Sequence, residues 1–352
     1  MPSILRIQRL GSASAPDSAG KEHDMQVTRR DFLRYCIGSA AALGLESTVL
    51  GSLEKALATG GGPPIVWLSA ASCTGCTVSL ANLVGPSKPT DVADLLINTV
   101  NLAYHPNLMG AAGATAVRVL RNATKTDNGY ILAVEGGIPR AFNGHACMLW
   151  TENGQEVTAL AAVKDLAPRA KAVLCIGTCA SFGGIPSGKP NPTNVASVQA
   201  VTGVKTINIP GCPAHPDWVV GTIAQLLAGS APSLDSLRRP KAYYGGSVIH
   251  ENCPRKNTDW ATHFGMDGNC LRGLGCKGVS THADCPKRQW NNHTNWCVGA
   301  NAICLGCTEK GFPDTFSPFF SVAGALPSDH ESVSGQCIDC HTGKGGRISG
   351  GD

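Results

Sequence analysis

Short apolar runs and amphipathic stretches alternate along the chain as far as about residue 229. Four of the runs are apolar enough to form strands buried on both faces of a sheet. They are residues 64–70, 130–134, 172–176 and 205–209, with residues 91–98 as a candidate for a further strand. Apolar residues recur with helical spacing between and after these runs, at residues 111–121, 157–166 and 218–228. The alternation predicts βαβ units and therefore an α/β fold around a parallel sheet.

This pattern stops near residue 240. Residues 245–312 contain many Gly, Asn and Pro residues and few apolar runs. Such a composition does not form a conventional core, so bound groups are expected to hold this region together. We predict one domain over residues 59–240, a second over residues 241–312, and a tail over residues 313–352.

Composition agrees with a folded chain of this kind. Its 352 residues leave room for about two domains on the usual scale of one per 100–200 residues. Hydrophobic residues make up 43% and charged residues 15%, which is typical of a globular protein. The formal net charge is only +4, so charge provides no argument for a nucleic-acid partner, and none is expected.

The first 58 residues have the features of an export signal. Residues 28–34, TRRDFLR, match the twin-arginine pattern that directs folded proteins out of the cytoplasm. Residues 35–53 are mildly apolar but too short and too polar to span a bilayer, and an A-x-A cleavage site follows at residues 56–58. An N-terminal amphipathic helix is the alternative. We predict a periplasmic protein without a transmembrane anchor of its own.

Eleven of the sixteen cysteines and one histidine form three groups of four. The groups are Cys73, Cys76, Cys179 and Cys212; His250, Cys253, Cys270 and Cys276; and Cys285, Cys297, Cys304 and Cys307. A cubane iron–sulfur cluster takes four thiolates, occasionally with one imidazole in place of a thiolate. The first group follows predicted strands, and ligand sites of parallel sheets lie beyond the carboxyl ends of the strands. Three complete sets predict a relay for single electrons, whereas structural zinc is the alternative for Cys and His sets of this kind.

The motifs that contain these ligands resemble the small subunit of nickel–iron hydrogenases. They are CTGCT at residues 73–77, GTCASFGG at 177–184, PGCP at 210–213, HxxC at 250–253 and CLGC at 304–307. The resemblance extends to about residue 320. It implies a flavodoxin-like first domain, a largely irregular cluster domain, and a separate large subunit that carries the nickel–iron site. It further implies that this chain, itself without catalytic residues, passes electrons from hydrogen oxidation to a periplasmic or membrane acceptor such as a cytochrome.

The resemblance also implies a role for each ligand group. The first group corresponds to the ligands of a proximal [4Fe–4S] cluster, the group with His250 to those of a distal [4Fe–4S] cluster, and the third group to those of a medial cluster. Many relatives have proline at the position of Cys297 and carry a [3Fe–4S] cluster there. Because Cys297 supplies a fourth thiolate, as in nickel–iron–selenium relatives, a medial [4Fe–4S] cluster is predicted here, with [3Fe–4S] as the alternative.

Two other functions share part of this pattern. A quinone-reducing subunit of respiratory complex I type has related proximal ligands, but it has adjacent cysteines in place of CTGC and lacks the eight ligands of the second domain. A non-enzymatic, ferredoxin-like carrier would use the same clusters without a nickel-containing partner, so copurification of such a partner distinguishes the two.

The tail contains a separate motif that the hydrogenase resemblance does not explain. Cys337, Cys340 and His341 form C-x-x-C-H, the attachment pattern of a c-type haem. Export favours this interpretation, since such haems are attached outside the cytoplasm. A disulfide and a loose metal site are the alternatives.

Overall fold

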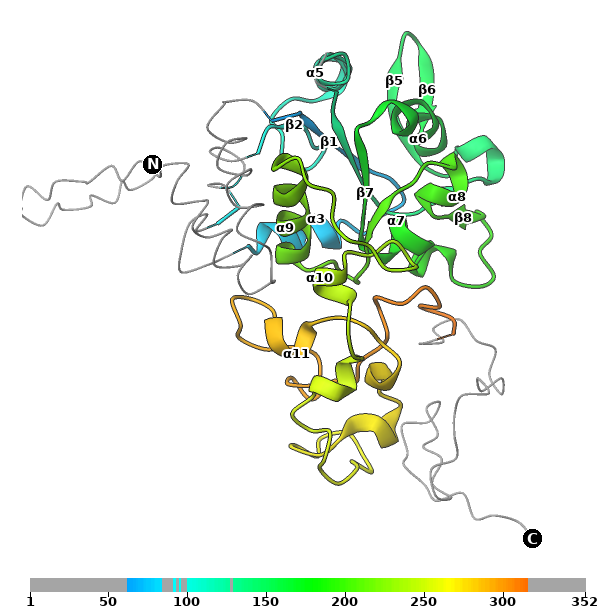
Figure 1. The fold of residues 1–352 in the computed structure, drawn as a ribbon. Helices are drawn as coiled ribbons and strands as arrows, with labels where there is room; N and C mark the ends of the chain where they lie inside the picture. Colours follow the sequence, from blue (N-terminus) through cyan, green and yellow to red (C-terminus); the bar gives the residue numbers. More distant parts are fainter. Residues whose placement is uncertain (1–61, 84–90, 93–94, 96–99, 127–128, 316–352) are drawn as a thin grey trace, which may run out of the picture.

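Five parallel strands form the central sheet of the part of the chain that the computed structural model describes, residues 62–83, 91–92, 95, 100–126 and 129–315 (Figure 1). The strands are β1 (Ile65–Ser69), β2 (Leu102–Tyr104), β3 (Ile131–Glu135), β7 (Ala172–Ile176) and β9 (Ile207–Ile209). Their order across the sheet is β2-β1-β3-β7-β9. This is the flavodoxin-like, doubly wound order, and it reverses direction between β1 and β3. The predicted α/β fold is confirmed.

Four of the predicted strands match β1, β3, β7 and β9 to within two residues. The candidate strand at residues 91–98 is wrong, because Val92 and Leu95 are helical. Val92 and Leu95 are three residues apart, a spacing that places both on one helix face. The edge strand is instead β2, which pairs with β1 through Leu102 and Tyr104.

Alternate residues of the strands supply two apolar cores, one on each face of the sheet. Val66 and Leu132 pack on the face covered by α5 (Gly113–Ala123) and α6 (Ala159–Leu166). Ile65 and Ile131 pack on the opposite face, against α3 (Gly75–Ala81) and α9 (Pro216–Leu227). Burial on both faces explains why these strands are almost continuously apolar in the sequence.

Shorter elements lie around this sheet and its main helices. They are β4 (Ile138–Pro139) paired with β8 (Val195–Ala196), the hairpin of β5 (Met148–Glu152) and β6 (Gln155–Thr158), the helices α7 (Gly177–Phe182) and α8 (Val198–Thr202), and the 3₁₀ turns η1 (Ala141–Gly144), η2 (Ala167–Arg169) and η3 (Ile185–Ser187).

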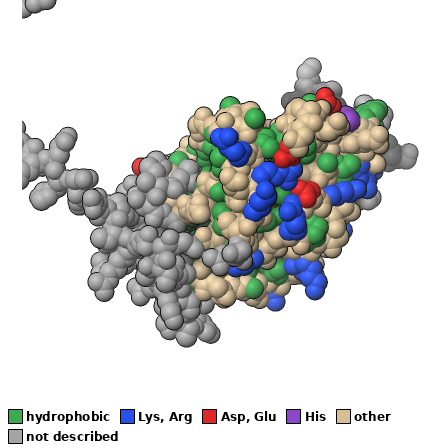
Figure 2. Space-filling view, turned by 90° about the horizontal axis from the view of Figure 1, so that it is seen from above, with side chains coloured by type: hydrophobic (Ala, Val, Ile, Leu, Met, Phe, Trp, Pro, Cys, Tyr) green, Lys and Arg blue, Asp and Glu red, His purple; other side chains and the backbone are tan. Residues whose placement is uncertain are grey.

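Viewed from the end that carries α5 and the hairpin, Lys and Arg side chains lie among Asp and Glu (Figure 2). Arg121 of α5 pairs there with Glu152 of β5 at 2.5 Å and with Asp165 of α6 at 2.7 Å, and so joins three elements.

Residues 245–315 lie at the opposite end of the molecule, below the sheet in Figure 1. Their elements are short: η4 (Ile249–Asn252), η5 (Leu271–Leu274), η6 (Lys277–Val279) and α11 (Cys285–Arg288), preceded by α10 (Lys241–Tyr244). Strand pairing among the described residues of this region is limited to two isolated bridges, at Trp260 and at Trp290. Its few large apolar side chains, Trp296 among them, continue the core between the sheet and α9.

No helix within the described ranges is long and apolar enough to cross a membrane.

Candidate iron–sulfur cluster sites

The first group of cysteines meets at the carboxyl edge of the sheet. Cys73 follows β1, Cys76 lies in the first turn of α3, Cys179 lies in α7 directly after β7, and Cys212 follows β9. Since β1, β7 and β9 are parallel, their carboxyl ends share one edge, where this fold type holds its ligands. The prediction that the strands bring these four residues together agrees with this arrangement.

Glycines leave room for the sulfur atoms at this edge. Gly177 has a φ of +81°, and a Cβ atom there would lie 2.5 Å from Cys76 Sγ. Gly184 has a φ of +55°, and a Cβ atom there would lie 2.9 Å from Cys179 Sγ. Both positions combine a left-handed backbone with close approach to a thiol, so a larger residue would occupy the space beside the sulfur atoms.

The electrostatics of this edge favour a bound cationic group. Burial raises the pKa of Cys76, and Glu135, Cys179 and Cys212 raise it further. Burial likewise raises the pKa of Cys179 to about 12, with further contributions from Cys212 and Cys73. Thiols in such a setting do not ionise together unless positive charge compensates them, and bound iron ions supply that charge and deprotonate the thiols. The four residues therefore fit a cluster.

Glu135, which sequence reasoning missed, lies against the same site. Its side chain is 2% exposed and accepts hydrogen bonds from the backbone amides of Cys76 at 3.0 Å and Thr77 at 3.2 Å. Trp67 Nε1 donates to it at 3.2 Å. The carboxylate thus fixes the first turn of α3, which carries Cys76. Its position at the carboxyl end of β3, in the run VEGG, was the available signal, because polar residues at strand ends of this fold face the ligand site.

The third group surrounds a cavity. A cavity of about 520 Å³ is lined by all four of its members, Cys285, Cys297, Cys304 and Cys307. Much of the remaining wall is apolar and includes Trp218, Trp290 and Trp296. Burial raises the pKa of Cys304 to about 12, and burial followed by the neighbouring thiols raises that of Cys285. A cavity of this size, walled by thiols and indoles, suits a multi-atom cluster rather than a single metal ion.

The second group lies farthest from the sheet. His250 is in η4, with Cys253 directly after it, and Cys270 and Cys276 flank η5. Burial raises the pKa of Cys276, and the nearby thiols Cys253 and Cys270 raise it further. A Cβ atom at Gly278 would lie 3.6 Å from Cys276 Sγ and 3.7 Å from the backbone nitrogen of His250. The structure therefore brings η4 and the three cysteines together.

The three groups form a sequence in space. Cys212 of the first group lines the cavity of the third group. At the far side of the third group, the backbone amide of Cys304 donates to Cys276 Sγ of the second group at 3.3 Å. The third group therefore lies between the other two, which is the order that a relay requires.

The remaining predicted site residues, Cys337, Cys340 and His341, lie outside the described residues, as does the twin-arginine motif.

A doubly wound sheet with thiols at its carboxyl edge, joined to an irregular region with two further groups of candidate ligands, is the arrangement expected of an iron–sulfur protein that transfers electrons. Residues 73–226 match the family model for the NADH ubiquinone oxidoreductase 20 Kd subunit. Residues 244–320 match the family model for the C-terminal part of the NiFe/NiFeSe hydrogenase small subunit.

Individual relatives span both of these regions. The chain is 38% identical over 319 residues to the periplasmic [NiFeSe] hydrogenase small subunit of Desulfomicrobium baculatum, a match that covers 84% of this chain and 99% of that protein. It is 40% identical over 302 residues to the periplasmic [NiFe] hydrogenase small subunit of Solidesulfovibrio fructosivorans, with 84% and 93% covered. Among solved structures, the recombinant [NiFeSe] hydrogenase of Desulfovibrio vulgaris Hildenborough matches with a TM-score of 0.68 and 38% identity, over 75% of this chain and 99% of that one.

The chain belongs to the family of small subunits of nickel–iron and nickel–iron–selenium hydrogenases. Small subunits of this family carry the iron–sulfur relay of the enzyme and pair with a large subunit that holds the nickel–iron site. The hydrogenase prediction is thereby confirmed. The quinone-reducing alternative is wrong, because the hydrogenase match includes residues 244–320, beyond the region that matches the 20 Kd subunit family.

Proposed function

We propose that this chain carries electrons one at a time through three clusters held by the ligand groups described above. The group with Cys73 holds the proximal cluster, the group with Cys285 the medial cluster, and the group with His250 the distal cluster. The single observation that carries this proposal is the spatial order of the groups, since Cys212 borders the third group and Cys276 accepts the amide hydrogen of Cys304.

The proximal end of this order is exposed. Cys73 and Cys212 are exposed in this chain, and Val78 on α3 is 55% exposed. Two exposed ligands and an exposed apolar side chain are best explained by a partner that covers them. The large subunit would dock here, so that two electrons from each hydrogen molecule enter at this end while two protons leave from the large subunit.

The chain's own residues would hold the clusters and keep water away from them. When bound, the clusters supply one-electron redox chemistry. Trp218, Trp290 and Trp296 line the medial cavity and lower its polarity, which is one of the factors that set cluster potentials. We propose [4Fe–4S] clusters at all three sites. At the medial site the support is Cys297, which lines the same cavity as the other three cysteines and would supply the fourth ligand.

The cellular setting rests on the sequence and on the relatives. We propose folded export by the twin-arginine route, cleavage after Ala58 and action in the periplasm, and the periplasmic relatives from Desulfomicrobium and Solidesulfovibrio support this location. The mature chain would consist of residues 59–240, residues 241–312 and the tail 313–352. A c-type or membrane cytochrome would accept the electrons that leave the distal cluster.

The tail would carry a c-type haem on Cys337 and Cys340, with His341 as an axial ligand. The C-x-x-C-H motif and the export signal are its support. Haem staining of the denatured chain from a host with cytochrome maturation tests it, because thioether-linked haem survives denaturation. An unstained band would leave the two cysteines as a disulfide or as ligands of a loose metal site.

Deletion of this chain from its host tests the relay as a whole. We expect hydrogen-dependent reduction of an artificial dye to be lost, and to return when the wild-type chain is supplied. Dye reduction that continues unchanged after deletion would overturn the proposed function.

A further inference from the structure

The contact between the first and third ligand groups depends on one buried threonine. Thr178 precedes Cys179 in α7 and is 1% exposed. Its backbone amide donates to Gly211 O at 3.0 Å, and the Gly211 amide donates back to Thr178 Oγ1 at 2.9 Å. These two bonds fasten α7, with Cys179, to the loop that carries Cys212.

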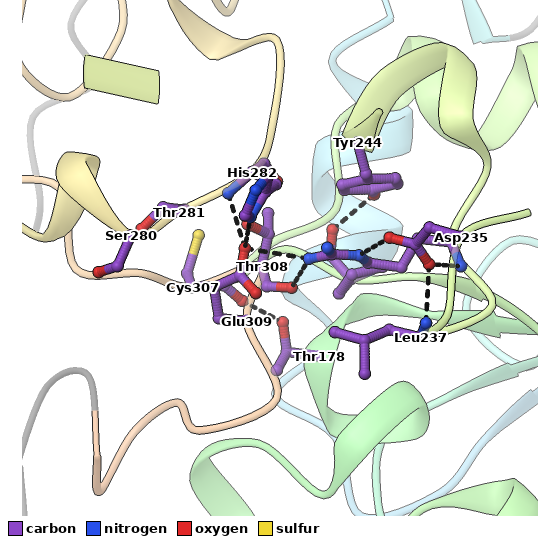
Figure 3. A network of polar contacts seen from close by, with 12 residues as sticks. Thr178, Asp235, Leu237, Tyr244, Ser280, Thr281, His282, Cys307, Thr308 and Glu309 are labelled. Carbon is purple, nitrogen blue, oxygen red and sulfur yellow. Dashed lines mark hydrogen bonds and ion pairs between the residues drawn. The ribbon is translucent and has the colours of Figure 1, made fainter. Parts of the chain in front are cut away.

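The same hydroxyl also reaches the third ligand group. Thr178 Oγ1 donates a hydrogen bond to the backbone oxygen of Cys307 (Figure 3). One oxygen atom therefore joins the chain beside Cys179, the loop before Cys212 and the peptide of Cys307. The three segments belong to two different cluster sites, and Thr178 and Cys307 are 129 positions apart in the sequence.

Polar contacts hold the Cys307 segment from its other side. Arg239 Nη1 donates to Thr308 O at 3.1 Å and to Glu309 Oε1 at 3.0 Å. Thr308 Oγ1 donates to the backbone oxygen of His282 at 3.0 Å, and the His282 amide donates to Glu309 at 2.6 Å (Figure 3). Residues 308–309 are thus held to Arg239 and His282, and the hydroxyl of Thr178 adds the contact to the Cys307 peptide itself.

The two sites share a wall at this point. Cys212 and Cys307 both line the cavity of the third group. A backbone hydrogen bond from Cys212 reaches the thiol of Cys307, so the two ligand groups are in contact at this point. Electron transfer between two centres depends steeply on their separation and on the bonded path between them. Hydrogen bonds to cluster sulfurs also set cluster potentials.

We propose that Thr178 is the positioning residue for the electron step between the proximal and medial clusters. It holds the Cys307 peptide against the Gly211–Cys212 loop and so fixes both the gap and the amide contact across which one electron moves. No bond breaks and no proton moves in this step: the proximal centre is oxidised and the medial centre is reduced by the same electron. The inference rests on the proposed function, because it needs clusters at both sites.

Four variants of the complete heterodimer, purified without oxygen, test this role. Thr178→Val keeps the shape of the side chain and removes the hydroxyl, while Thr178→Ser and Thr178→Ala form a second pair that differs only in the hydroxyl. Ser181→Ala is the matched control: Ser181 lies in the same helix, is 3% exposed, and donates to Cys175 O at 3.2 Å within the sheet domain.

The readout is electron paramagnetic resonance during a redox titration. It yields the magnetic coupling between the reduced proximal and medial clusters and their difference in potential. We expect the Val and Ala variants to weaken the coupling and to shift the electron-sharing equilibrium between the two clusters by about fivefold to tenfold, as the loss of one hydrogen bond would. The Ser variant should match the wild type, and Ser181→Ala should lower only the melting temperature.

Two results would overturn the inference, and they differ in what else they affect. Unchanged coupling and unchanged potentials in Thr178→Val, or equal behaviour of the Ser and Ala variants if the Val variant does not assemble, would refute the role of Thr178 and leave the relay intact. A wild-type heterodimer without a coupled pair of clusters would refute both this inference and the proposed function.

Discussion

The two regions of this chain, the sheet region and residues 245–315, reach a folded state by different means. The sheet domain buries Ile65, Val66, Ile131 and Leu132 completely or almost completely, with helices on both faces. Residues 245–315 have one-turn helices and 3₁₀ turns, and the four cysteines of the third group line a cavity of about 520 Å³. The sheet region therefore owes its fold to apolar burial, whereas residues 245–315 would need the proposed clusters to compensate their buried thiols.

The largest expected effect is that of iron removal, because it should unfold only the region that depends on bound clusters and leave the region that depends on apolar burial intact. Removal of iron by oxidation and chelation should speed amide hydrogen exchange in residues 245–315 by roughly 100-fold or more, because the cavity then collapses or opens. Amides of β3 and β7 should remain protected. Hydrogen–deuterium exchange with mass spectrometry measures both regions in one sample.

Reconstitution with iron and sulfide is the control for that experiment and should restore protection. Equal loss of protection in β3 and in residues 245–315 would contradict the comparison. So would full protection of both regions after the iron has been removed.

Two buried cysteines of the sheet domain sharpen the comparison further. Cys179→Ser removes a proposed proximal ligand, so hydrogen-dependent dye reduction by the purified heterodimer should fall by about 100-fold or more. Cys175, four residues earlier in β7, is fully buried and belongs to no ligand group. Cys175→Ser should retain activity and lose about 1–3 kcal/mol of stability, because it places a hydroxyl in the apolar core. Similar activities in the two variants would contradict the proposed role of Cys179 as a ligand of the proximal cluster.

The smallest expected effect concerns the type of the medial cluster. Cys297→Pro should convert a [4Fe–4S] centre into a [3Fe–4S] centre with a higher potential, while the heterodimer stays assembled and active. Electron paramagnetic resonance of the oxidised protein shows the change as a new [3Fe–4S] signal, and a redox titration gives its potential.

Cys147→Ala is the control for that substitution, since Cys147 lies in the sheet domain outside all three groups, and it should give no new signal. A stoichiometric [3Fe–4S] signal from wild-type protein kept free of air would contradict the predicted four-thiolate site.

The same contrast explains what the sequence could predict. The strands β1, β3, β7 and β9 are buried on both faces and therefore read as continuous apolar runs. The edge strand β2 has only three residues, too few for a periodic signal, and the apolar residues near Val92 belong to a helix instead. The β5–β6 hairpin was also missed, because Met148 and other half-exposed residues give it little apolar contrast.

Candidate ligand positions are easier to propose from a sequence than the residues that support them. Cysteine spacing identifies thiols whatever the local structure is, so the three groups could be assigned without knowing how residues 245–315 fold. Glu135 and Thr178 act through contacts 58 or more and 129 positions away, and their types are common in any sequence. Only the three-dimensional arrangement distinguishes them from other buried polar residues.

The number of electrons that the iron–sulfur centres take up from hydrogen tests the central claim most directly. The anaerobically purified heterodimer is mixed with hydrogen, and bleaching of the visible iron–sulfur absorbance is calibrated against its iron content. Three cubane clusters predict about twelve iron atoms in this chain and about three electrons taken up, one per cluster. Iron or electron uptake equivalent to fewer than three clusters, or no bleaching by hydrogen, would contradict a three-cluster relay.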